Sequence, residues 1–142
     1  MLNHLGQGRF KAYSAGSRPQ GQPNPFAISL LQREGIDITF ARSKSWDEFA
    51  GPDAEKLDFV FTVCDNAAAE ACPFWPGQPI SAHWGQPDPA AAQGTDAEKA
   101  LAFADTYRAL TRRIVAFVAL PMATLDALTL KSRLSDIGRD TA

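Results

Sequence analysis

The chain has 142 residues and a mass of 15.4 kDa, which is the size of one domain with a sizeable core. Its net charge of −2 is spread among residues of both signs, so no basic face favours nucleic acid or an anionic membrane. No apolar run approaches the roughly 18 residues of a membrane span, and two cysteines make no disulfide framework. We therefore expect a single cytoplasmic domain over residues 1–142, without membrane or nucleic-acid partners.

The N-terminal part of the sequence predicts one strand and one helix. Met1–Leu5 reads as the last turn of a helix, and Arg9–Ala15 alternates as a strand does. Asn24 is a helix cap followed by proline, and the helix that it opens should stop at Gly35. Ile36–Phe40 alternates weakly and predicts a short edge strand.

Two further apolar runs each lead into reactive side chains. Phe59–Val63 runs into Cys64, and Pro79–His83 runs into Trp84 and then Asp88. Ligand sites in open α/β sheets lie at the carboxyl ends of the strands, so we expect a site at this edge.

The C-terminal part predicts two helices. Thr95 and Glu98 form a capping box, and the helix after it carries apolar residues at spacings of three and four up to Pro121. A last helix around Leu130 should end at Gly138. Strands separated by helical segments predict an α/β fold with a mostly parallel sheet.

The two cysteines, Cys64 and Cys72, are the candidate redox residues. They stand eight positions apart and can relay oxidising equivalents by disulfide exchange if the segment between them coils. The alternative is that Cys64 is a small apolar residue at a strand end and Cys72 is incidental. Two cysteines and one nearby histidine fall short of a zinc site, so no metal is predicted.

Asp88 is the candidate general acid. It lies between Pro87 and Pro89, which restrict the backbone, and beside Trp84, whose ring would desolvate the carboxyl group and raise its pKa. The alternative is a plain Asp-Pro turn. His83 is expected to point inward and to be hydrogen-bonded.

The segment Ser14–Arg18 is a strand end followed by small residues and a base. Backbone amides there can help to frame an anion, although the pattern by itself is better explained by an ordinary strand-to-loop turn.

Taken together, these blocks resemble the arsenate reductases built on the low-molecular-weight protein tyrosine phosphatase fold. The resemblance covers about Leu2 to Arg139 and is most specific in its last two blocks. The blocks are Ser14–Ser17, Asn24-Pro25, Asp58–Cys64, Cys72–Pro76 (Cys-Pro-Phe-Trp-Pro) and His83–Pro89 (His-Trp-Gly-Gln-Pro-Asp-Pro).

The resemblance implies a three-layer αβα fold around a small parallel sheet, with Phe10–Ala15, Phe59–Cys64 and Pro79–Trp84 as its second, third and fourth strands. It implies that Asp88 is the general acid and that Cys64 and Cys72 form the redox relay. The implied reductant is an external thiol such as thioredoxin, glutaredoxin or glutathione, and no cofactor is bound.

The resemblance also implies an oxyanion substrate, arsenate or a phosphate-like group. We expect Ser17, Arg18 and Trp84 to contribute to its binding site.

One family motif is absent from the sequence. The family's nucleophile lies in a Cys-x5-Arg-Ser loop, but Glu70 stands six residues after Cys64 and Gln78 six residues after Cys72. The domain is therefore expected to be N-terminally incomplete, lacking its first central strand and anion loop. Such a chain should be inactive by itself and should be less stable or self-associate through open strand edges.

Two other functions fit the same residues. A tyrosine phosphatase would use Asp88 without a relay, but phosphatases of this class commonly carry tyrosines after Asp-Pro, whereas Pro89 is followed by Ala90, Ala91 and Ala92. A non-catalytic remnant that binds a partner through its open sheet is the third reading.

Overall fold

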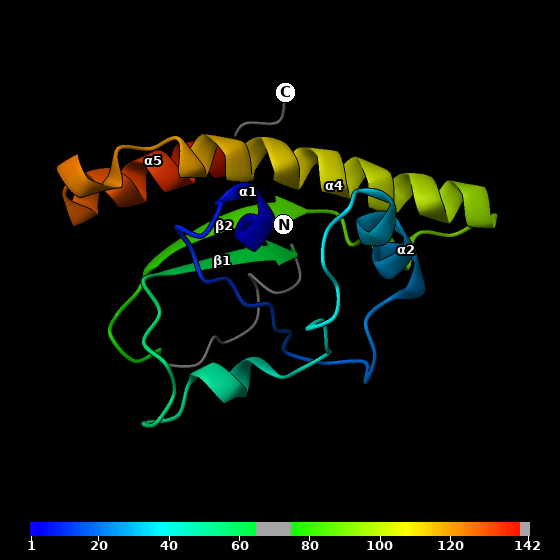
Figure 1. Cartoon of the computed structure of the whole chain (residues 1–142), viewed down its shortest axis with the longest axis horizontal. Helices are drawn as coiled ribbons and strands as arrows, with labels where there is room; N and C mark the ends of the chain where they lie inside the picture. The colour runs from blue at the N-terminus through cyan, green and yellow to red at the C-terminus, as the bar shows by residue number, and fades with distance from the viewer. Residues whose placement is uncertain (65–74, 140–142) are drawn as a thin grey trace.

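A computed structural model describes residues 1–64 and 75–139 of the chain, and for Cys64 it describes the backbone alone (Figure 1). Its strands are β1 (Phe59–Cys64) and β2 (Ile80–Gln86), which pair in parallel. The helices are α1 (Leu2–Leu5), α2 (Pro25–Arg33), α4 (Asp96–Val118) and α5 (Ala127–Arg139). Short 3₁₀ turns form at η1 (Trp46–Phe49), η2 (Pro89–Ala91) and η3 (Met122–Thr124). The predicted α/β class with a small parallel sheet is confirmed.

The predicted helix starts are confirmed because each depends on residues close in sequence. The Asn24 side chain accepts a hydrogen bond of 2.9 Å from the Phe26 amide, and Pro25 is the first residue of α2. At α4 the Thr95 hydroxyl accepts from the Glu98 amide at 3.2 Å, and the Glu98 carboxylate accepts in return from the Thr95 amide. Both reciprocal hydrogen bonds of the capping box are therefore formed.

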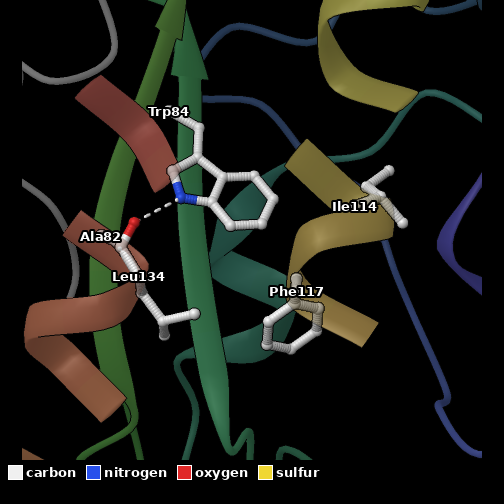
Figure 2. Close-up of a cluster of buried hydrophobic side chains, with 5 residues drawn as sticks. All are labelled: Ala82, Trp84, Ile114, Phe117 and Leu134. Atoms are coloured by element: carbon white, nitrogen blue, oxygen red, sulfur yellow. Dashed lines mark hydrogen bonds between the residues drawn. The ribbon is translucent and has the colours of Figure 1, made fainter. Parts of the chain in front are cut away.

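The core lies on one face of the sheet, beneath α4 and α5 (Figures 1 and 2). Along β2, Ala82 and Trp84 are buried while Ser81 and His83 are exposed, which is the alternation of a strand with one covered face. Phe117 of α4 and Leu134 of α5 close over this face and are 1% and 0% exposed. The two long helices therefore anchor the strand that leads into Asp88.

The segment Phe10–Ala15, predicted as a strand, does not form one. The amide group of Asn3 brackets Ala12, accepting from its N–H at 2.7 Å and donating to its C=O at 3.3 Å. A strand needs a backbone neighbour for these groups, and here a side chain takes that role. The Phe10 ring instead packs on Phe117, with ring centroids 5.2 Å apart. The nearest strand-like pairing is a single parallel bridge between Gly16 and Ser45.

Two other local predictions are wrong. Ile36–Phe40 forms no strand, because the Asp37 carboxylate accepts from both the amide and the hydroxyl of Thr39 and so closes a turn. Gly138 does not end the last helix, since α5 continues to Arg139. Among the described residues no helix is both long and apolar enough to span a bilayer.

Candidate functional site

The C-terminal edge of the sheet brings together the two segments that the sequence singled out. In the parallel ladder Thr62 is paired with His83, and Cys64 is paired with Gln86. Gln86 is the last residue of β2, and Asp88 follows two positions later. The backbone of Cys64 therefore lies at the edge from which the Asp88 loop leaves. The side chain of Cys64 and the whole of Cys72 lie outside the described residues.

The same ladder contains a β-bulge just before this edge. Between one pair and the next, β1 advances from Thr62 to Cys64 while β2 advances from His83 to Gln86, so β2 carries one extra residue. A bulge leaves that residue without a ladder partner and turns the strand beyond it. The bulge consequently sets the direction in which the chain runs toward Asp88.

A buried arginine binds the carbonyl groups at this bulge. Arg113 of α4 is 5% exposed, and its Nη1 donates to the carbonyl oxygens of Trp84 at 2.7 Å and Gly85 at 3.2 Å. The sequence analysis missed Arg113. A signal was present, since Arg113 lies three positions after Leu110 and four before Phe117, within the apolar stripe of the helix.

Asp88 is held in place by its own turn. It precedes η2, and its Oδ1 accepts a 3.0 Å hydrogen bond from the Ala90 amide. The predicted desolvation by a neighbouring ring is wrong, because Asp88 is exposed. The role of Asp88 as a general acid stays a prediction.

Trp84 lies in the hydrophobic core. It is 3% exposed, it stacks on Phe61 with ring centroids 4.0 Å apart, and its indole N–H donates to the Leu134 carbonyl at 3.0 Å (Figure 2). The expectation that Trp84 binds substrate therefore conflicts with its geometry: the ring is covered and its donor is occupied. The residue anchors β2 between α4 and α5.

Ser17 and Arg18 follow the bridge between Gly16 and Ser45. Ser17 is half-buried and Arg18 is exposed. Among residues 1–64 and 75–139, no hydrogen bond or ion pair joins either of them to Asp88. Their proposed part in anion binding stays a prediction.

His83 lies on the face of the sheet opposite Trp84. Its Nδ1 and the hydroxyl of its ladder partner Thr62 form a 2.7 Å hydrogen bond. The hydrogen bond was expected, but the inward orientation was not correct, since His83 is exposed. No group of three His, Cys, Asp or Glu side chains within the described parts could hold a metal ion.

An open cleft of about 720 Å³ lies elsewhere, between α2 and the start of α4. Phe26, Arg33 and Asp96 are among the residues that line it; of the predicted site residues with described side chains, Ser17, Arg18, Trp84 and Asp88, none does. The candidate site is therefore the strand edge and not this cleft.

Comparison with known proteins places the chain in a family. The family model described as low molecular weight phosphotyrosine protein phosphatase matches residues 1–127. A protein of Halalkalibacterium halodurans named arsenate reductase is 38% identical over 105 residues, which cover 74% of this chain and 72% of the relative. Arsenate reductases of Bacillus licheniformis and Bacillus subtilis are each 39% identical, over 68% and 63% of this chain and 65% and 61% of their own lengths. The chain therefore belongs to the low molecular weight phosphotyrosine protein phosphatase family.

Proposed function

We propose that the protein is an arsenate reductase of the low-molecular-weight phosphatase-like class. In this reaction arsenic accepts two electrons, which two thiols supply as they form one disulfide, and one oxygen of arsenate leaves as water. Arsenite is the product, and an external thiol must then reduce the disulfide. The proposed setting is the cytoplasm, where thiol reductants keep cysteines reduced.

The proposal is supported first by the relatives, since those of H. halodurans, B. licheniformis and B. subtilis are all named arsenate reductase. It is supported second by the ladder pairing of Cys64 with Gln86, which sets a cysteine backbone beside the strand end that leads into Asp88. A reductase needs a thiol and a proton donor close together, and a parallel sheet gathers both at one edge.

We assign the roles as follows. Asp88 donates the proton that the departing oxygen needs, and its bond from the Ala90 amide fixes the carboxylate at the start of η2. Cys64 and Cys72 pass the disulfide to a reductant such as thioredoxin, glutaredoxin or glutathione. Ser17 and Arg18 help to bind the oxyanion substrate. Arg18 is exposed, and its guanidinium forms no ion pair within the described residues, which leaves its charge available for an anion.

Phosphotyrosine phosphatase activity is the second candidate, since the family is named for it. One observation counts against it. The residues after Pro89 are alanines, which form η2 and offer no aromatic ring to grip a phosphotyrosine. A non-catalytic remnant is the third candidate.

The test uses a version of the protein to which a Cys-x5-Arg segment of one of the arsenate reductase relatives has been joined at the N-terminus, purified and reduced. Arsenate-dependent oxidation of thioredoxin or glutathione is measured beside hydrolysis of p-nitrophenyl phosphate. We expect arsenate reduction to dominate, and we expect Asp88→Asn to lower its rate by about 100-fold or more. The matched control is Asp53→Asn, an exposed aspartate of a separate turn, which should keep the rate. Dominant phosphatase activity would contradict the proposal, and absence of both activities would favour the remnant.

A second measurement concerns the 142 residues by themselves. They include no Cys-x5-Arg segment, so we expect them to reduce no arsenate and to self-associate or to melt below the extended version. Turnover by these residues, or equal melting of a monomer, would contradict this expectation.

A further inference from the structure

We propose that Arg113 is a positioning residue, which fixes the Asp88 loop against the C-terminal end of β1 by binding the bulge in β2. The inference rests on the proposed function, because the position of Asp88 matters for catalysis only if Asp88 is the proton donor. The hydrogen bonds and the ladder that carry it are properties of the fold.

Arg113 is buried and donates hydrogen bonds to backbone carbonyl groups at the bulge. A buried guanidinium is costly unless its donors are satisfied, and helix α4 offers many exposed positions for a cation. Arg113 is nevertheless 5% exposed, and one of its nitrogens donates to two successive carbonyl groups, those of Trp84 and Gly85. These are the residues that lie between the ladder pairs of His83 and Gln86.

The second observation is what the bulge changes. Side chains alternate along a strand, so a single extra residue turns every later side chain to the other face. Without the bulge, β2 would advance by only two residues while β1 advances from Thr62 to Cys64. The chain after Gln86 would then leave the sheet in another direction. The side chain of Arg113 stabilises the longer path by binding its carbonyl groups.

The third observation is that the same helix also holds the far side of the loop. η2, which begins immediately after Asp88, packs against α4. The loop is therefore fastened to α4 at two places, by Arg113 at the strand end and by the packing of η2. Asp88 lies between them, and its Oδ1 accepts the Ala90 amide.

Arg113→Met tests the proposal, since it keeps much of the apolar stem and removes every donor. Arg113→Lys keeps the charge and three donors on a different geometry. Arg112→Met is the matched control, because Arg112 is the adjacent arginine of the same helix and is exposed. Backbone amide chemical shifts and hydrogen exchange are measured by NMR. The reporters are Gln86, Ala90 and Ala91, and the Leu134 amide of α5 is the global reference.

In Arg113→Met we expect the three reporter amides to shift and to exchange about tenfold faster relative to Leu134, since hydrogen bonds to a charged group are lost. Arg113→Lys should recover at least half of this change on a logarithmic scale, and Arg112→Met should match the wild type. If reporters and reference speed up together, or if the reporters keep their wild-type shifts, Arg113 only stabilises the core and the proposal is wrong.

Should Arg113→Met fail to fold, Arg113→Lys decides. In that variant the exchange rates of the reporter amides must rise above their wild-type values by a larger factor than the exchange rate of the Leu134 amide does. An equal rise at the reporters and at Leu134 would contradict the proposal. None of these readouts depends on arsenate. A protein that fails to reduce arsenate but shows the local change would contradict the proposed function and leave the role of Arg113 intact.

Discussion

Gly138 of α5 lies directly against the backbone of His83 in β2. A methyl group on Gly138 would stand 2.4 Å from the His83 carbonyl oxygen and 2.8 Å from Cδ1 of Trp84. Contacts this short with backbone require the helix or the strand to move. Gly138 is thus a packing residue, which lets α5 approach the strand that leads into the candidate site.

The first prediction concerns this contact. Gly138→Ala should lower the free energy of unfolding by about 1–3 kcal/mol, because overpacking outweighs the roughly 1 kcal/mol that alanine gains in a helix. Chemical denaturation measures the change. Gly51→Ala is the control, since a Cβ there meets nothing within 4 Å. A more stable Gly138→Ala protein would show that the helix can shift freely.

The second prediction separates packing from binding at Trp84. Trp84→Phe removes the indole donor from the Leu134 carbonyl and leaves space beside Phe61, so we expect a loss of about 1–3 kcal/mol of stability. Trp46→Phe makes the same change at a half-buried position and should cost less. Substrate affinity of the folded Trp84→Phe protein should be unchanged. A large loss of affinity with unaltered stability would restore the substrate role that the sequence suggested.

The third prediction is a pH dependence at the start of α5. The Asp126 carboxylate accepts from the Thr129 amide at 2.7 Å, and this bond lowers the pKa of Asp126 below its ordinary value of 3.8. The unfolded chain therefore takes up this proton first as the pH falls. The stabilisation is complete above the unfolded pKa and is lost as the pH falls through the folded pKa.

Asp126→Asn keeps a cap that accepts the same bond but does not titrate. We expect the Tm of the wild type to fall more steeply than that of Asp126→Asn between about pH 5 and about pH 2. Melting curves by circular dichroism at several pH values provide the measurement. Parallel pH profiles for the two proteins would contradict the assignment.

Features that depend on neighbours in sequence were predictable. Asn24 and Thr95 cap their helices through bonds that reach two or three residues along the chain, and the apolar run at Phe59 forms the strand that it predicted. The meeting of Cys64 with the strand before Asp88 followed from topology, because parallel strands share their carboxyl edge.

Features that depend on distant partners were not predictable. The alternation in Phe10–Ala15 is strand-like, but the Asn3 amide and not a strand binds Ala12. Trp84 reads locally as part of a reactive loop, yet α4 and α5 bury it. The carbonyl groups of Trp84 and Gly85, to which Arg113 donates, lie 29 and 28 positions away in sequence, and no local pattern predicts a bulge there.

The bracket between Asn3 and Ala12 has a consequence for how the molecule comes apart. Within the described residues, few hydrogen bonds and ion pairs fasten the first dozen residues to the rest of the chain: Arg9 Nη1 donates to the Val118 carbonyl at 3.0 Å and Lys11 pairs with Glu55, while the Asn3 amide holds Ala12. An extended ladder would fasten a paired strand at many points. The leading segment should therefore detach before the rest of the chain loosens, and Phe10 would leave the ring of Phe117 as it goes. Early and reversible detachment of this segment would expose the ring of Phe117 while the strand edge at the candidate site is still folded.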